Sequence, residues 1–220
     1  MKTPIFAAQG FVHLLIDGAK NDPKVRDRFL KKAAKSLDSL DVLVKDLIAI
    51  SQLETGEFRL ELDDFDIIQL IKDEIDQFEH KAKKKKIKLT FTSNVEQPIY
   101  VHADYYRIAQ VFQNLISNGI NYAGEKSTIS ISAIHGGDFV FFEVKDDGIG
   151  ISEEHLSSIF NRFYRVDKSR SREKGGSGLG LSIVKHIVEA HDSSISAKSS
   201  LGQGVTFQFQ LKIIEPINEA

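Results

Sequence analysis

The sequence predicts an α+β protein in two parts. Residues 1–56 are expected to form an antiparallel helical hairpin, which would make a four-helix bundle as a dimer. Residues 57–220 are expected to form an α/β sandwich, in which a mixed sheet carries helices on one face. Two observations predict this. Apolar residues recur at steps of three and four up to about residue 53, and beyond residue 57 alternating strand-like runs follow helical runs and glycine-rich turns.

Composition limits the classes of function. The chain has 220 residues, of which 41% are hydrophobic and 27% charged, and a net charge of -2. The apolar share is ample for a packed core, and the charge argues against a nucleic-acid partner, which would usually meet a strong basic excess. The absence of cysteine excludes a disulfide framework and thiolate zinc sites.

No apolar run approaches membrane-spanning length, and the first residues do not begin a signal peptide. We therefore expect a cytoplasmic chain with no membrane contact in these residues. Anchoring of the intact protein in the inner membrane stays open.

The hairpin is predicted from two helical patterns. The first pattern ends at Asp17-Gly18, and the second helix begins at Asn21-Asp22-Pro23, with proline in its first turn. The second helix carries an a/d seam. Two helices alone cannot bury this apolar seam, so we expect a second copy of the chain to cover it in a homodimer. The alternative is that the hairpin packs on the rest of its own chain. The seam consists of Leu30, Ala33, Leu37, Leu40, Val44, Leu47 and Ser51.

The second part begins after a joint at Thr55-Gly56-Glu57. A helix over 66–83 is capped by Asp66, and a long helix over 104–123 turns Ile108, Val111, Phe112, Leu115 and Ile116 inward. Alternation predicts the strands, two of which form a hairpin about Gly136-Gly137-Asp138. The predicted strands are 58–62, 87–92, 99–102, 127–134, 139–145, 194–199 and 205–212, and two further helices are 152–160 and 178–191.

Three segments of this part carry the chemistry of a nucleotide site. Asp146-Asp147-Gly148-Ile149-Gly150 offers a carboxylate, which can only accept a hydrogen bond and so suits an adenine amino group. Gly175 to Leu181 is a glycine loop that runs into a helix, where backbone N–H groups can meet phosphates. Asn114 and Asn118 lie on adjacent helical turns, where an amide oxygen can serve a hydrated Mg²⁺.

In this order the segments resemble the ATP-binding domain of sensor histidine kinases, a branch of the GHKL ATPases with the Bergerat fold, joined to a HisKA-type dimerisation hairpin. The N box corresponds to 114–122, the first glycine box to 146–150, the F box to 160–165, the second glycine box to 176–181 and the last glycine turn to 202–207. Other nucleotide and hydrolase motifs fail: there is no Gly-Lys-Ser/Thr of a P-loop, and Leu179 stands where a nucleophile elbow needs glycine.

The resemblance implies the cofactors ATP and Mg²⁺ and a role for each matching residue. Asp146 would accept from the adenine amino group, Asn118 would hold Mg²⁺ with Asn114 in support, and Tyr122 would line the adenine pocket. Asn121 stands where many relatives carry a basic residue. The alternative for Asp146 and its neighbour is that they cap a strand end. The ATP-binding set implied is Asn114, Asn118, Asn121, Tyr122, Asp146, Gly148, Gly150, Arg162, Arg165, Lys168, Gly176, Ser177, Gly178, Leu179, Gly180, Leu181 and Thr206.

The segment after the F box corresponds to the mobile ATP lid of the family. Its cations, of which Arg170 and Arg172 are two, could meet the triphosphate. Phe160 and Phe163 are expected to pack the root of the lid onto the core.

The phosphoacceptor segment of such kinases commonly reads His-Glu-Leu-Lys-Thr-Pro, whereas this chain starts Met1-Lys2-Thr3-Pro4. We therefore expect a truncated core whose acceptor His precedes residue 1. Thr3 matches the Thr that relatives use in dephosphorylation. His13 lacks an acidic neighbour and is expected to be an ordinary helix residue.

The function expected is that of a histidine kinase core, which binds Mg-ATP and, in the intact protein, transfers phosphate to a His and then to an Asp of a response regulator receiver domain. The 220 residues alone are expected to bind ATP without autophosphorylation. Two alternatives stay open: a nucleotide-binding dimerisation module or pseudokinase without phosphotransfer, and another GHKL ATPase such as a chaperone or mismatch-repair ATPase.

Overall fold

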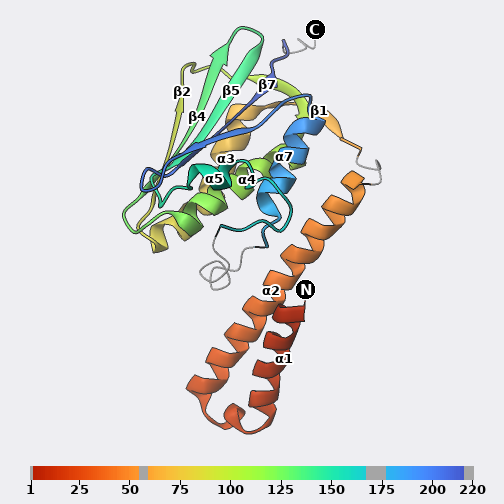
Figure 1. Cartoon of the computed structure of the whole chain (residues 1–220), viewed down its shortest axis with the longest axis vertical. Helices are drawn as coiled ribbons and strands as arrows, with labels where there is room; N and C mark the ends of the chain where they lie inside the picture. The colour runs from red at the N-terminus through yellow and green to blue at the C-terminus, as the bar shows by residue number, and fades with distance from the viewer. Residues whose placement is uncertain (1, 55–58, 167–176, 216–220) are drawn as a thin grey trace. The chain divides into compact units, whose positions relative to one another are not determined.

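The computed structural model of the chain describes residues 2–54, 59–166 and 177–215 (Figure 1). Contacts divide the chain into two compact units, Met1–Phe58 and Arg59–Ala220. No helix in the described part of the chain has the length and apolar character needed to cross a membrane.

The first unit consists of helices α1 (Lys2–Ile16) and α2 (Pro23–Glu54), joined through the 3-10 helix η1 (Ala19–Asn21). The two long helices lie side by side and run in opposite directions (Figure 1). The ring of Phe11 on α1 stacks on that of Phe29 on α2, with centroids 5.8 Å apart.

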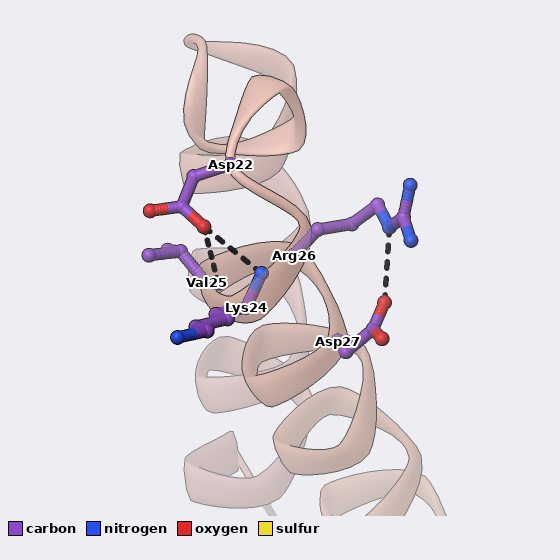
Figure 2. A network of polar contacts seen from close by, with 5 residues as sticks. All are labelled: Asp22, Lys24, Val25, Arg26 and Asp27. Atoms are coloured by element: carbon purple, nitrogen blue, oxygen red, sulfur yellow. Dashed lines mark hydrogen bonds and ion pairs between the residues drawn. The ribbon is translucent and has the colours of Figure 1, made fainter.

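Helix α2 begins with a side-chain cap (Figure 2). The Oδ1 of Asp22 accepts hydrogen bonds from the backbone N–H of Lys24 at 2.9 Å and of Val25 at 3.3 Å. These two donors lack partners within the helix, and Pro23 precedes them with no N–H to satisfy. The expected helix start at Asn21-Asp22-Pro23 is confirmed.

Large apolar side chains remain exposed on both helices of the first unit. Within the expected seam, Ala33 is buried, whereas Leu30, Leu37 and Val44 follow one another at heptad spacing and are 51%, 56% and 40% exposed. The unit therefore leaves an apolar stripe on α2 uncovered. The other exposed large apolar residues of this unit are Ile5, Phe6, Val12, Leu14, Ile16 and Ile48.

The second unit is built around a five-stranded mixed sheet with the strand order β2-β4-β5-β7-β6. Strand β2 runs parallel to β4, and the other neighbours are antiparallel. Helices α3, α4 and α7 lie along one face of the sheet (Figure 1), so the expected mixed sheet with helices on one face is confirmed. The elements are β1 (Leu62–Asp66), α3 (Ile67–Lys84), β2 (Lys88–Ser93), β3 (Tyr100–Asp104), α4 (Tyr105–Tyr122), β4 (Thr128–Gly136), β5 (Phe139–Asp146), α5 (Glu153–Leu156), α7 (Gly180–Ala190), β6 (Ser196–Ser199) and β7 (Val205–Lys212).

Two strands form a separate sheet, which the sequence did not predict. The first strand lies at Leu62–Asp66 rather than at 58–62, and it pairs antiparallel with β3. Each strand runs directly into a helix whose N-cap is the last residue of the strand: Asp66 caps α3 and Asp104 caps α4. The aspartates satisfy helix N–H groups at this point, so the small sheet sets where both helices start.

Helix α4 lies at the centre of the helical layer, in contact with α3 and α7. Its expected inward residues, from Ile108 to Ile116, are all at most 1% exposed. The Phe112 ring meets Phe142 of β5 at 5.5 Å and Phe209 of β7 at 5.6 Å between centroids. This packing holds α4 against the sheet at the strand that ends in Asp146.

Candidate functional site

The carboxylate of Asp146 is buried at the end of β5, with 8% of the residue exposed. Its Oδ1 accepts from the backbone N–H of Gly148 at 2.9 Å, and the N–H of Val205 also donates to the carboxylate. Burial raises the pKa of Asp146 above its usual value, and the nearby charge of Asp147 adds to this, while the two N–H donors oppose it. Burying a charged carboxylate in this way lowers the stability of the folded chain. Proteins often keep such a group because it has a function.

Asp147 differs from its neighbour. Its side chain is exposed, and its two carboxylate oxygens lie 3.0 and 2.9 Å from the backbone N–H of Thr128, at the start of β4. Asp147 therefore caps the end of a strand, whereas the carboxylate of Asp146 faces the interior beside a glycine turn.

Gly148 lets the turn after β5 pack closely beside the carboxylate and the end of α4. A Cβ atom at this position would lie 2.7 Å from Oδ1 of Asp146 and 3.0 Å from the carbonyl oxygen of Tyr122. The turn after β5 therefore touches the last residue of α4. Tyr122 is 37% exposed there, and Asn121 beside it is half-buried.

The two glycine turns at 146–150 and 202–204 pack back to back. A Cβ atom at Gly204 would meet the carbonyl oxygen of Asp146, and one at Gly150 would meet that of Ser200. The N–H of Gly202 donates to the carbonyl oxygen of Ile149 at 2.8 Å. The turn between β6 and β7 thereby holds the backbone on which the Asp146 carboxylate stands.

Thr206 does not belong to this cluster. Side chains alternate along a strand. In β7 every second residue from Val205 to Leu211 is buried, whereas Thr206 lies on the opposite face of the sheet, in register with Lys145 and Lys198. The residue that reaches Asp146 is Val205, through its backbone N–H. Its position directly after the glycine turn was the only sequence signal for this contact.

The amide of Asn114 on α4 has an unsatisfied donor. Its Nδ2 is buried and has no hydrogen-bond partner among the residues that the structure describes. Its Oδ1 lies 3.3 Å from the point where a Cβ atom of Gly180 would stand, so Asn114 faces the start of α7. A buried N–H without an acceptor is unfavourable by about 1–3 kcal/mol, and a ligand oxygen would satisfy it. Asn118 is half-buried one turn further along α4.

The start of α7 adds backbone donors beside Asn114. The first bond within this helix runs from the N–H of Ile183 to the carbonyl oxygen of Leu179 at 2.9 Å, so the N–H groups of Gly180 and Leu181 precede it. Such N–H groups, together with the helix dipole, favour an anion. Ser177 shapes the turn, because its Oγ accepts from the N–H of Leu179 at 3.1 Å. The side chain of Leu179 is 1% exposed and contributes to the core rather than to the site surface.

The F-box segment packs against the second glycine box. A Cβ atom at Gly178 would lie 3.0 Å from the carbonyl carbon of Phe163 and 3.1 Å from the carbonyl oxygen of Tyr164. Arg162 reaches α7, with its NH2 atom 3.5 Å from Nε2 of His186. The Nε and NH2 atoms of Arg165 are buried and have no hydrogen-bond partner within the described ranges.

Several expected residues are placed differently or lie outside the described part. Phe160 packs on Phe207 with ring centroids 6.3 Å apart, as expected, but Phe163 is 63% exposed and does not pack onto the core. Its φ of 60° turns the backbone toward Gly178, and this turn directs its ring to solvent. Thr3 lies in α1, and nothing is described of its side chain; His13 on the same helix is exposed. Lys168, Arg170, Arg172 and Gly176 lie outside the described residues.

The arrangement combines a buried carboxylate acceptor, an amide donor that has no partner in the described part of the chain, and the N-terminus of a helix. A carboxylate accepts from an amino group of a base, and the other two groups attract phosphate oxygens. The amide oxygen of Asn118 is a hard neutral ligand of the kind that Mg²⁺ accepts alongside water and phosphate. These residues fit a magnesium–adenine nucleotide.

Comparison with known proteins agrees with this geometry. Residues 103–215 match the family of histidine kinase-, DNA gyrase B- and HSP90-like ATPases. Sensor histidine kinase WalK of Bacillus subtilis is 34% identical over 214 residues, which are 96% of this chain and 34% of that protein. The chain therefore spans about a third of the length of this curated relative.

Solved structures of histidine kinases share the fold. The nucleotide-free catalytic domain of histidine kinase ThkA is 32% identical with a TM-score of 0.62, and the match covers 70% of this chain and 96% of that domain. ThkA in complex with the response regulator protein TrrA is 28% identical with a TM-score of 0.76, over 97% of this chain and 58% of that one.

Proposed function

The chain belongs to the family of histidine kinase-, DNA gyrase B- and HSP90-like ATPases, and on that premise we propose that it is the kinase core of a two-component sensor protein. Its second unit would bind Mg-ATP for transfer of the γ-phosphoryl group to a histidine. The observation that carries the proposal is the buried carboxylate of Asp146, which lies beside a glycine turn at the end of α4, the helix whose Asn114 faces the start of α7.

Adenine would be recognised by Asp146. The adenine amino group donates a hydrogen bond, whereas guanine carries a carbonyl oxygen at the same position, so a carboxylate selects adenine. The ring would lie beside this carboxylate and near Tyr122, whose carbonyl oxygen lies close to Gly148 at the end of α4. Because the Asp146 carboxylate is buried, the hydrogen bond is stronger there than at the surface.

The phosphates would lie between α4 and the start of α7. There the Nδ2 of Asn114 and the first N–H groups of α7 offer donors, and Arg162 and Arg165 add positive charge. Asn118 would bind Mg²⁺, which neutralises charge on the phosphates. These residues bind and orient the nucleotide, so that an attacking imidazole nitrogen can form its bond to the γ-phosphorus while the bond to the β-phosphate oxygen breaks and ADP leaves.

The first unit would form a homodimer. Its support is the row of Leu30, Leu37 and Val44, which is exposed at heptad spacing and would be covered by the same row of a second copy. The partner in signalling would be the receiver domain of a response regulator, as ThkA is found with TrrA. The phosphoryl group would pass there from histidine to aspartate.

The 220 residues alone would bind nucleotide without forming phosphohistidine. Helices α1 and α2 contain a single histidine, His13, and the residue that follows it is Leu14 rather than an acidic residue. Incubation with γ-labelled ATP should therefore leave no acid-labile label on the chain. Such a label would show that one of the seven histidines is an acceptor.

A titration calorimetry experiment tests the proposed site. A non-hydrolysable ATP analogue should bind with Mg²⁺ present, and the matching GTP analogue should bind at least about tenfold more weakly, since a mispaired buried carboxylate costs 1–3 kcal/mol, roughly. Asn118→Ala should weaken binding only when Mg²⁺ is present. Equal affinities for both nucleotides, or an equal loss with and without metal, would refute the respective assignment.

A further inference from the structure

A cavity lies between α3 and α4, and none of its lining residues belongs to the nucleotide site. Its volume is about 460 Å³, within the size range of small-molecule pockets. The lining is mostly polar and aromatic, with side chains from both helices. The residues are Glu74 and Gln77 from α3 and Tyr105, Tyr106, Arg107, Ala109, Gln110 and Gln113 from α4.

Glu74 is the unusual group of this cavity. The residue is 5% exposed, and its Oε1 accepts from Nε2 of Gln77 at 3.2 Å and from Nε2 of Gln113 at 3.1 Å. Its Oε2 is buried and has no hydrogen-bond partner in the part of the chain that the structure describes. A buried carboxylate oxygen that lacks a donor is unfavourable, so a donor from outside the chain would stabilise it.

Two tyrosines stand at the same cavity. The rings of Tyr105 and Tyr106 meet edge to face with centroids 5.5 Å apart, and Tyr106 is 77% exposed although it is large and aromatic. Phe65 of β1 supports Tyr105 from the side, at 5.1 Å between ring centroids. Aromatic faces beside an anion attract cations.

The buried carboxylate of Glu74 favours a cationic ligand over an anionic one. The NH1 atom of Arg107 donates to Oε1 of Gln110 at 3.3 Å. Burial raises the pKa of both Glu74 and Tyr105, and the nearby charge of Asp73 adds to each shift. An anion would face the buried carboxylate, and an apolar ligand would leave Oε2 without a donor.

We propose that the cavity between α3 and α4 binds a primary alkylammonium group, whose N–H donors meet Oε2 of Glu74 and whose methylene chain lies against Tyr105 and Tyr106. The side-chain oxygen of Gln77 or Gln113 is a second acceptor for the same group. The ammonium comes from a free small amine or from a lysine side chain, and both sources share this chemistry. The inference is independent of the nucleotide site.

The test is an NMR titration of the full chain with three probes: butylammonium chloride, butanol as its uncharged counterpart, and Nα-acetyl-lysine methylamide as a lysine mimic. An ammonium probe should shift backbone amide signals of α3 and α4 around Glu74 and Gln113 saturably, and butanol should not. The tighter of the two ammonium probes identifies the source. Absence of saturable shifts with both, or equal binding of butanol, overturns the proposal.

Three variants sharpen this test. Glu74→Gln should weaken ammonium binding at least about tenfold, because a hydrogen bond to a charged group is lost. Tyr106→Ala, at an exposed position, should weaken it by roughly two- to fivefold through the lost ring face. Asp73→Asn is the matched control: this carboxylate accepts from Nε2 of Gln69 at 2.7 Å, does not line the cavity and should change affinity less than about twofold.

If Glu74→Gln fails to fold, the titration of the wild-type protein still shows whether the cavity binds an ammonium group. Unchanged ammonium affinity in a folded Glu74→Gln protein overturns the assignment of Glu74. Nucleotide affinity should be the same in all three variants, so failure at this cavity is distinct from failure of the proposed function.

Discussion

Asp104 and His191 are joined by a hydrogen bond between positions 87 residues apart: the backbone N–H of Asp104 donates to Nε2 of His191 at 3.0 Å. The other ring nitrogen, Nδ1, donates to the carbonyl oxygen of Ile187 at 2.7 Å. The imidazole is therefore neutral, with its proton on Nδ1. It ties the end of α7 to the residue that caps α4 and that also accepts from the N–H of Glu61 at 3.0 Å.

This bond predicts a loss of stability in acid. Burial lowers the pKa of His191 from its ordinary 6.5, and the contact with Ile187 and the nearby Asp104 and Asp192 only partly oppose this. The unfolded chain therefore binds a proton at a higher pH than the folded one. The contribution of the neutral ring is fully present above pH 6.5 and declines as pH falls from there toward the folded pKa.

Urea unfolding at pH 7.5 and 5.5 measures this effect. At pH 7.5 the free energy of unfolding of His191→Gln should be lower than that of the wild type by roughly 1–3 kcal/mol, because the N–H of Asp104 loses its acceptor. Between pH 7.5 and 5.5 the variant should lose less stability than the wild type does. His13→Gln, at an exposed position, is the control and should follow the wild type. An identical pH dependence in the His191 variant would contradict the prediction.

Asp146→Asn should separate binding from stability. Adenine-nucleotide affinity should fall about tenfold or more, because a charge-assisted hydrogen bond is lost. The melting temperature without nucleotide should stay equal or rise, since burial already raises the pKa of Asp146 and the variant removes a buried charge.

The adjacent Asp147→Asn is the matched control for this change. It should keep nucleotide affinity within about twofold but lower stability slightly, by roughly 0.5–1.5 kcal/mol, because its carboxylate accepts from Thr128 at the start of β4. Equal nucleotide affinities in the two variants would place adenine elsewhere.

Gly204→Ala should destabilise the second unit far more than Gly202→Ala. Both glycines have a positive φ, 74° and 77°, so each substitution should cost about 1–2 kcal/mol in backbone strain. At Gly204 the added Cβ would also meet the carbonyl oxygen of Asp146, whereas at Gly202 it would meet nothing within 4 Å. The overlap should add roughly 1–3 kcal/mol, which thermal unfolding measures. Equal effects would mean that the two turns are not packed as described.

Leu37→Asp should dissociate the proposed dimer. Leu37 is 56% exposed within one chain and lies in the centre of the row from Leu30 to Val44. Light scattering at micromolar concentration should give twice the chain mass for the wild type and the chain mass for this variant. Lys35→Glu, at an exposed position on the opposite side of α2 from the row, should stay dimeric. A monomeric wild type would refute the dimer.

Local patterns in the sequence were sufficient for the long helices α3, α4 and α7 of the second unit, whereas the helix predicted over 152–160 covers only Glu153–Leu156. The inward row from Ile108 to Ile116 and the cap at Asp66 depend on residues within one or two helical turns, so the spacing alone predicts them. The glycine boxes likewise mark the turns that surround Asp146. Strand β7 occupies the predicted range, 205–212, because its alternation is regular.

Only the tertiary structure decided which of these residues meet. Strand pairing depends on distant partners, so the sequence did not show that β1 and β3 form their own sheet. Because side chains alternate along β7, neighbouring residues point to opposite faces of the sheet. The backbone N–H of Val205 reaches the Asp146 carboxylate, whereas Thr206 lies on the other face.

By itself, the sequence determined most of the elements, the cap at Asp66 and the nucleotide motifs, since each arises from residues close together in the chain. The packing of α3 on α4 and of α7 on α4 brought Glu74 beside Gln113, His191 beside Asp104 and Asn114 beside Gly180. Those contacts join residues many positions apart, and only the folded chain brings them together.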